Sequence, residues 1–165
     1  MSYEIHPETP AEGISLERLF GPAIRNSQEG VRRRCVELGL HFEAPELLSN
    51  SRLAIEAAEF ARDAGRHPEF HREVLAAYFA RSEDIGDVEV LARAAERVGL
   101  DPADLRAGLA GGAYAARRGA AEAEARELGV TAVPTYIFPG GNRVVGAQPV
   151  DYFRRLLTSL TAAER

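Results

Sequence analysis

The chain has a single cysteine, Cys35, and this number limits the redox chemistry that its own residues can perform. Thiol–disulfide exchange needs an attacking thiolate, and no Cys-x-x-Cys motif is present to supply one together with its partner. Cys35 follows Val31 and precedes Leu38 at helical spacing, which predicts a small side chain buried in an apolar stripe. We therefore predict no catalytic residue for disulfide exchange in this sequence.

The four histidines offer little more chemistry. His67 and His71 are four residues apart, a spacing that could place two metal ligands on one helix face. Pro68 suits the first turn of a helix, so His67 is predicted to be a cap or pre-helical residue, and no clear third ligand accompanies the pair. His6 and His41 have no serine or cysteine partner that the sequence identifies. We predict no metal site.

A third feature is the Val133-Pro134 step, which leads directly into the β-rich run Thr135–Phe138. A cis bond before proline turns the chain sharply and can leave the N–H and C=O of the preceding residue free to pair with an extended ligand. A trans proline that ends a loop before a strand is the alternative. The wider pattern around the step favours the cis form, with the backbone of Val133 facing a groove.

Composition indicates one ordinary globular domain. With 165 residues, of which 45% are hydrophobic, the chain can bury one sizeable core. The net charge of −5 gives no electrostatic reason to expect nucleic acid or an anionic membrane as a partner. No signal peptide is visible, no apolar run approaches ~18 residues, and one cysteine cannot form an internal disulfide. We therefore expect a cytoplasmic protein.

The helices and strands that position these residues are predicted from capping residues and from the spacing of apolar residues. We predict a strand at Tyr3–His6, a series of helices, and then two strands and a last helix that starts at Pro149. The strands Thr135–Phe138 and 143–145 flank a tight turn at Pro139–Asn142. The first predicted helix covers 16–20, with Ser15 as its cap, and the second runs from a cap at Asn26 or Ser27 to Gly39. The next helices are predicted at Ser49–Gly65, from Pro68 onward, at Asp87–Val98 and from Asp101-Pro102 onward. An alanine-rich helix that ends at Leu128-Gly129 follows them.

These motifs, in this order, resemble one known family. Gly129–Thr135, followed by a hairpin and Gly146-Ala147-Gln148-Pro149, is similar to the C-terminal half of DsbA-like thioredoxin-fold proteins. The FrnE-like cytoplasmic oxidoreductases are the most similar branch, and 2-hydroxychromene-2-carboxylate isomerase and kappa-class glutathione transferase are relatives. Glu4–Pro7 and Pro10–Gly13 resemble the end of the family's second strand and the loop that follows it. The family's helical insertion is similar to the segments Asn50–Ala54, Ala77–Phe79 and Asp84–Leu91.

The resemblance implies an α/β, thioredoxin-like (DsbA-like) fold with a large all-helical insertion, in which the N-terminal βα unit with its Cys-x-x-Cys is missing. It implies one domain over residues 1–165. Residues 1–13 and 129–165 would form its thioredoxin-like part, and 14–128 the helical insertion and connecting helix. The residues that it implies for substrate binding are Val133, Pro134, Thr135, Gln148 and Asn50.

By resemblance, the function is that of a thiol–disulfide oxidoreductase, and we expect no exchange by this chain alone because the Cys-x-x-Cys segment is absent. Two alternatives stay open: a glutathione-dependent isomerase or transferase relative, and a non-catalytic protein that binds a peptide or thiol at the proline loop. We expect no cofactor, except glutathione in the first alternative. The expected partner is an extended peptide or small thiol ligand. The strand Thr135–Phe138 would have an open edge, which either the strand Tyr3–His6 or a second copy of the chain could cover. We favour a homodimer, because one short strand cannot also replace the missing helix.

Overall fold

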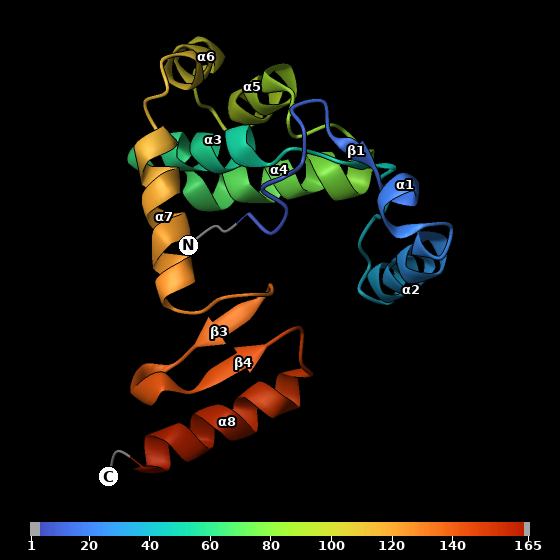
Figure 1. Ribbon diagram of the computed structural model, residues 1–165, viewed down its shortest axis with the longest axis vertical. Helices are drawn as coiled ribbons and strands as arrows, with labels where there is room; N and C mark the ends of the chain where they lie inside the picture. Colours follow the sequence, from blue (N-terminus) through green and yellow to red (C-terminus); the bar gives the residue numbers. More distant parts are fainter. Residues whose placement is uncertain (1–3, 164–165) are drawn as a thin grey trace. The chain divides into compact units, whose positions relative to one another are not determined.

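The computed structural model describes residues 4–163, which form two compact units. Within these residues, the first unit ends at Glu124 and the second begins at Ala125. Figure 1 shows helices throughout the first unit and a hairpin with one helix in the second. The grouping of residues 1–13 with 129–165 in one domain stays a prediction.

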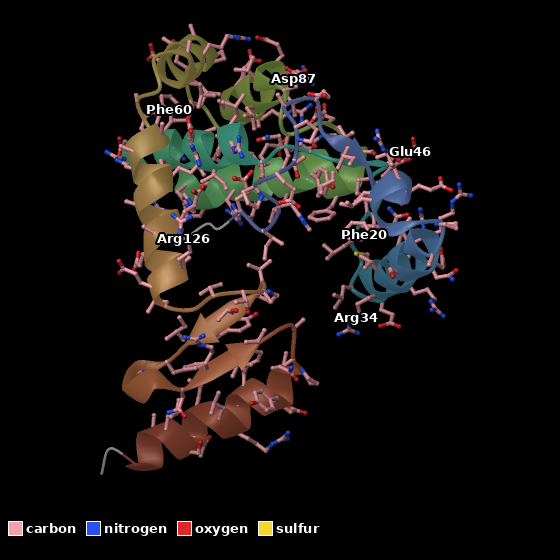
Figure 2. The ribbon with its side chains drawn as sticks, viewed as in Figure 1. Phe20, Arg34, Glu46, Phe60, Asp87 and Arg126 are labelled. Atoms are coloured by element: carbon pink, nitrogen blue, oxygen red, sulfur yellow. The ribbon has the colours of Figure 1, made fainter. Side chains whose placement is uncertain are left out.

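The first unit is built mainly of helices. They are α1 (Leu16–Phe20), α2 (Ile24–Glu37), α3 (Arg52–Asp63), α4 (His67–Arg81), α5 (Val88–Arg97), α6 (Pro102–Ala110) and the first part of α7 (Ala115–Glu127). Asp87 caps α5 by accepting a hydrogen bond from the N–H of Glu89 at 2.9 Å, and Figure 2 shows its place at the start of that helix. Asp101 caps α6 in the same way, at 2.7 Å from the N–H of Ala103. The predicted starts of these two helices are confirmed, because a cap is a local signal.

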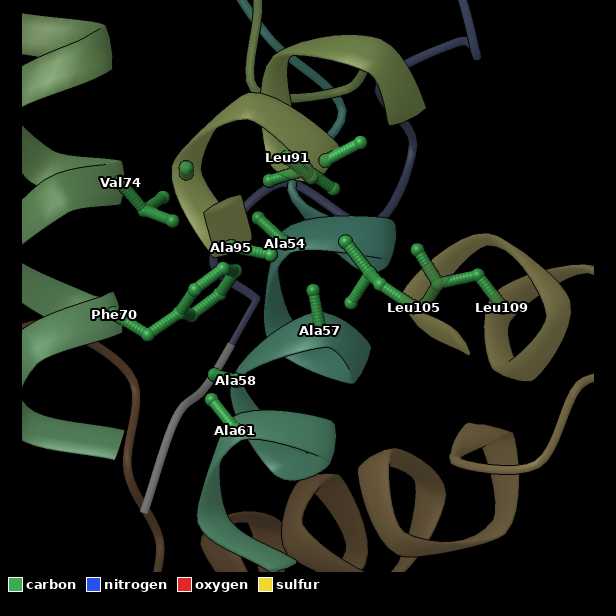
Figure 3. Packing of buried hydrophobic residues seen from close by; sticks show 12 residues of the cluster. Ala54, Ala57, Ala58, Ala61, Phe70, Val74, Leu91, Ala95, Leu105 and Leu109 are labelled. Carbon is green, nitrogen blue, oxygen red and sulfur yellow. The ribbon is translucent and has the colours of Figure 1, made fainter. Parts of the chain in front are cut away.

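A core of small and apolar side chains joins α3, α4, α5 and α6 (Figure 3). Phe70 of α4 is fully buried, and alanines of α3 and α5 let these helices approach it closely. Leu91 and Leu105, from α5 and α6, are also fully buried.

Two very short strands join the start of the chain to the approach to α3. Strand β1 (Ile14–Ser15) pairs antiparallel with β2 (Leu47–Leu48), with Ile14 opposite Leu48. Gly13 precedes β1 with φ of 75°, and a Cβ there would lie 2.9 Å from both the Leu47 side chain and the Leu48 carbonyl oxygen. Glycine is therefore required for this close approach.

The strand predicted at Tyr3–His6 is not found. Tyr3 lies outside the described residues, and Glu4–His6 have no strand conformation. The buried carboxylate of Glu4 instead forms an ion pair with Arg52, at 3.2 Å. The N–H of Thr9 then donates to the carbonyl of His6 at 3.0 Å, which closes a turn. The sequence pattern was misleading because, among the described residues, no strand pairs with Glu4–His6.

Helix α2 corrects a second prediction. It begins at Ile24, ahead of the predicted caps, and none of its residues is buried. Val31 and Leu38 are 47% and 57% exposed, and Cys35 is half-buried. The apolar stripe was correctly placed on one helix face, but the prediction of a buried core cysteine is wrong, because no other element covers that face fully.

The second unit is a hairpin with a helix. Strand β3 (Thr135–Ile137) pairs antiparallel with β4 (Arg143–Val145), and η1 (Pro139–Gly141) forms the turn between them. Gly140 has φ of 79° in that turn, as the Gly-Gly pair predicts. Helix α8 (Val150–Ala163) contributes Phe153, whose ring lies edge-on to Tyr136 of β3 at 4.7 Å between centroids. The predicted hairpin and last helix are confirmed, with β3 one residue shorter than expected.

Candidate functional site

The segment before β3 is the strongest candidate site of the second unit. The bond between Val133 and Pro134 is cis, as the sequence pattern predicts. The side chain of Val133 is 52% exposed. In the described part of the chain, neither the N–H nor the C=O of Val133 has a hydrogen-bond partner. An exposed residue thus offers one donor and one acceptor to an incoming extended chain.

The neighbours of Val133 are held in place by hydrogen bonds. The carbonyl of Pro134 accepts from the N–H of Gly146 at 2.8 Å, so the loop is tied to the end of β4. The Thr135 hydroxyl donates to the carbonyl of Ala132 at 2.6 Å, which closes the loop on its other side. The free backbone groups of Val133 are therefore presented from a loop that is anchored at both ends.

Gln148 lies beyond the same end of the hairpin. Thr135 opens β3 and pairs with Val145, which closes β4, so the hairpin register brings the segment 133–135 and the segment after β4 to one end. Gln148 is exposed, and its amide donates to the carbonyl of Val145 at 3.5 Å, a long and weak contact. The register thus brings together four of the five residues predicted for substrate binding.

Asn50, the fifth, lies in the first unit and is 8% exposed. Its amide nitrogen donates to the carbonyl of Thr9 at 2.7 Å, and its oxygen accepts from the N–H of Arg52 at 3.1 Å. Both polar atoms of the side chain are thus already paired, one to the N-terminal segment and one to the first turn of α3. Its role in substrate binding stays a prediction, and the contacts that it makes are structural.

The loop end of the hairpin has no ionisable side chain between Thr131 and Ile137 apart from the Tyr136 phenol. It therefore carries no thiol that could attack a disulfide. What it can do is bind: it presents free backbone groups, the apolar surface of Val133 and Pro134, and the amide of Gln148. The single thiol, Cys35, is on α2 in the first unit.

The two histidines singled out by their spacing stack on each other. The rings of His67 and His71 lie 5.7 Å apart and nearly parallel, and α4 begins at His67 itself. Burial, followed by the positive charge of Arg62, lowers the pKa of His67. No group of three or more His, Cys, Asp or Glu side chains in residues 4–163 is arranged to hold a metal ion. Over the same residues, no helix is long and apolar enough to cross a membrane.

Comparison with known proteins supports the fold and the family. The sequence model of one protein family, described as the DSBA-like thioredoxin domain, matches residues 4–158 of this chain. The uncharacterised protein YwbO of Bacillus subtilis is 30% identical over 134 residues, which cover 79% of this chain and 66% of that protein. The chain thus spans about two thirds of this relative's length. The crystal structure of the probable DsbA oxidoreductase SCO1869 from Streptomyces coelicolor matches with a TM-score of 0.85 and 27% identity, over 98% of this chain and 74% of that one.

Proposed function

Because this chain belongs to the DSBA-like thioredoxin domain family, we propose that it takes part in thiol–disulfide chemistry as the substrate-binding part of an oxidoreductase. The observation that carries this proposal is the exposed Val133, whose backbone donor and acceptor have no partner within the described residues. An extended peptide that places a cysteine beside this loop would pair with both groups, as a strand pairs with a sheet edge.

The residue inventory limits what this chain does by itself. Exchange of a dithiol for a disulfide needs an attacking thiolate and a second thiol that resolves the mixed disulfide. Cys35 is the only thiol in the sequence, and the loop that would bind the substrate contains none. The proposed role of the 165 residues is therefore binding and orientation of the substrate, without turnover of their own.

The edge of β3 that faces away from β4 completes the proposed binding surface. Among the described residues, β3 pairs with β4 alone, so its other edge offers further backbone groups in line with Val133. A peptide strand would occupy this edge. A second copy of the chain is the competing occupant, and sedimentation at low micromolar concentration separates the two, because only the second copy makes the mass depend on protein concentration.

The test is binding of a short, extended, cysteine-containing peptide, measured by fluorescence anisotropy. Val133→Asp should weaken this binding by about tenfold or more, because it places a carboxylate beside carbonyl groups of the bound peptide. Val150→Asp is the matched control, since Val150 in α8 is also a valine that is more than half exposed, at 65%, and its substitution should leave binding unchanged.

Three results would decide against parts of the proposal. Equal loss of binding in both variants, or no binding at all, would remove the loop as a peptide site. Displacement of the peptide by reduced glutathione would favour the glutathione-dependent alternative. Insulin reduction by this chain that disappears in Cys35→Ser would contradict the view that it only binds.

A further inference from the structure

A groove in the first unit lies between α2, α4 and the segment that leads out of α2. Its volume is about 610 Å³. The residues that line it are Val31, Cys35, Leu40, His41, Phe42, Arg72, Leu75, Ala76, Phe79 and Ala80. All of these residues belong to the first unit, whereas Val133 belongs to the second, and what the groove binds is independent of the function proposed above.

The walls of the groove are apolar and exposed to solvent. Val31 and Leu40 are 47% and 58% exposed on one side, and Leu75 and Phe79 are 43% and 42% exposed on α4. Apolar surface left in water costs about 25 cal/mol per Å², and soluble proteins rarely gather several such side chains around one hollow without a use. The other apolar faces of α4, at Phe70 and Val74, are buried in the core.

The floor and rim of the groove are held rigidly. The N–H of Glu43 donates to the carbonyl of Phe79 at 2.8 Å, and the rings of Phe42 and Phe79 stack at 6.3 Å. On the outer side, the Arg32 guanidinium donates to the carbonyl of Phe42 at 3.2 Å and lies over its ring. The shape of the groove is thus fixed by contacts on both of its sides.

The ionisable side chains of the groove, apart from Cys35, are basic. Arg72 and His41 line it, and no carboxylate does. The Nε of Arg72 donates to the carbonyl of Pro68 at 3.2 Å, and its two terminal nitrogens have no partner among the described residues. These two nitrogens form the edge of the guanidinium that binds a carboxylate with two parallel hydrogen bonds. The groove therefore combines apolar walls with one unneutralised anchor for an anion.

From this combination we infer that the groove binds a small apolar molecule that carries a carboxylate, with its tail among Val31, Leu75 and Phe79 and its carboxylate on Arg72. Size supports a small ligand over a peptide helix. The volume lies in the range of about 300–1,000 Å³ typical of small-molecule sites, whereas a helix is about 10–12 Å across and needs a longer trough.

Cys35 makes the inference directly measurable. Its thiol lines the groove and is half-buried, and it is the only cysteine of the chain. A ligand in the groove would cover this thiol and slow its modification by a thiol reagent. The rate of labelling at Cys35 therefore reports occupancy of the groove itself and no other place on the protein.

The experiment uses dodecanoate as the probe, below its micelle concentration, with dodecanol as the uncharged counterpart. Dodecanoate should bind with one site per chain by calorimetry and should slow labelling of Cys35 in the same concentration range. Arg72→Gln should lower the affinity for dodecanoate by about tenfold, since it removes hydrogen bonds to a charged group. The affinity for dodecanol, which carries no charge, should change little. Arg33→Gln, a substitution of the same kind at an exposed arginine of α2 outside the groove, should change neither.

A second variant tests the apolar part. Ala76→Phe fills the groove and should abolish binding of both probes while the circular dichroism spectrum stays that of the parent. The inference is overturned if dodecanoate binds without protecting Cys35, if Arg72→Gln and Arg33→Gln behave alike, or if dodecanol binds as tightly as dodecanoate. It is also overturned if Cys35 becomes protected with rising protein concentration alone, because a second copy would then be the occupant.

Discussion

The guanidinium of Arg118 in α7 lies 3.0 Å from the carboxylate of Glu56 in α3, and both side chains are largely buried, at 21% and 8% exposed. Glu122 binds the same guanidinium at 2.6 Å. The hydrogen bonds from Glu56 and then Glu122 raise the pKa of Arg118, so the cation is stabilised by its surroundings. This pair joins two helices of the first unit that are far apart in the sequence.

Removal of Arg118 should therefore destabilise the protein strongly. Arg118→Gln leaves the Glu56 carboxylate buried without a cation, and the expected loss is about 3 kcal/mol in the free energy of unfolding. The neighbouring Arg117 pairs with Asp63 at 2.6 Å, but both of those side chains are about half exposed. Arg117→Gln should cost under about 1 kcal/mol. Urea unfolding of the two variants checks the difference, and equal losses would contradict it.

The cap of α5 gives a local prediction. Asp87→Ala removes the acceptor for the N–H of Glu89 and should cost about 1 kcal/mol of stability. Asp87→Ser keeps a side-chain oxygen that can accept the same bond, so it should recover most of that loss. Thermal unfolding measures both variants. If alanine and serine destabilised the protein equally, the cap would not be the cause.

Tyr78 should make the protein sensitive to high pH. Burial raises the pKa of Tyr78 to about 12, and its hydroxyl donates to the carbonyl of Leu47 at 2.7 Å. The folded state holds the hydroxyl proton of Tyr78 more tightly than the unfolded chain does. The resulting contribution to the free energy of unfolding is therefore fully present below the ordinary pKa of 10.0. It is lost as the pH rises from there towards the folded value.

The measurement compares unfolding of the parent and of Tyr78→Phe across this pH range. The variant lacks the hydrogen bond to Leu47 and should be less stable by about 1 kcal/mol at neutral pH. Its stability should fall less steeply above the ordinary pKa, since the titrating hydroxyl is gone. Parallel pH profiles for the two proteins would show that Tyr78 is not the group responsible.

Cys35 should react with a thiol reagent in the native protein. It is half-buried and lines an open groove, so the reagent does not have to wait for unfolding. The labelling rate should therefore stay flat as urea rises towards the unfolding transition. A rate that climbs steeply with urea below the transition would mean that the thiol becomes accessible only in an opened form.

The sequence by itself determined those elements whose signals are local. Asp87 and Asp101 cap their helices because a side-chain oxygen two residues away from a free N–H is sufficient for the bond. The Val133-Pro134 step, the Gly-Gly turn and the two strands around it are likewise encoded within about fifteen residues, and the hairpin appears as expected. The motifs that identify the family belong to this group.

The tertiary structure alone decided which apolar faces are covered. The stripe of α2 has the same spacing as that of α3, but α3 packs into the core and α2 leaves Val31 and Cys35 at a groove. Periodicity shows which side of a helix is apolar, and only the neighbouring elements determine whether that side is buried. The same holds for Glu4, whose alternating surroundings suggested a strand until Arg52, 48 residues away, was found to bind its carboxylate. Contacts over such distances are made by the fold as a whole, so no window of sequence contains them.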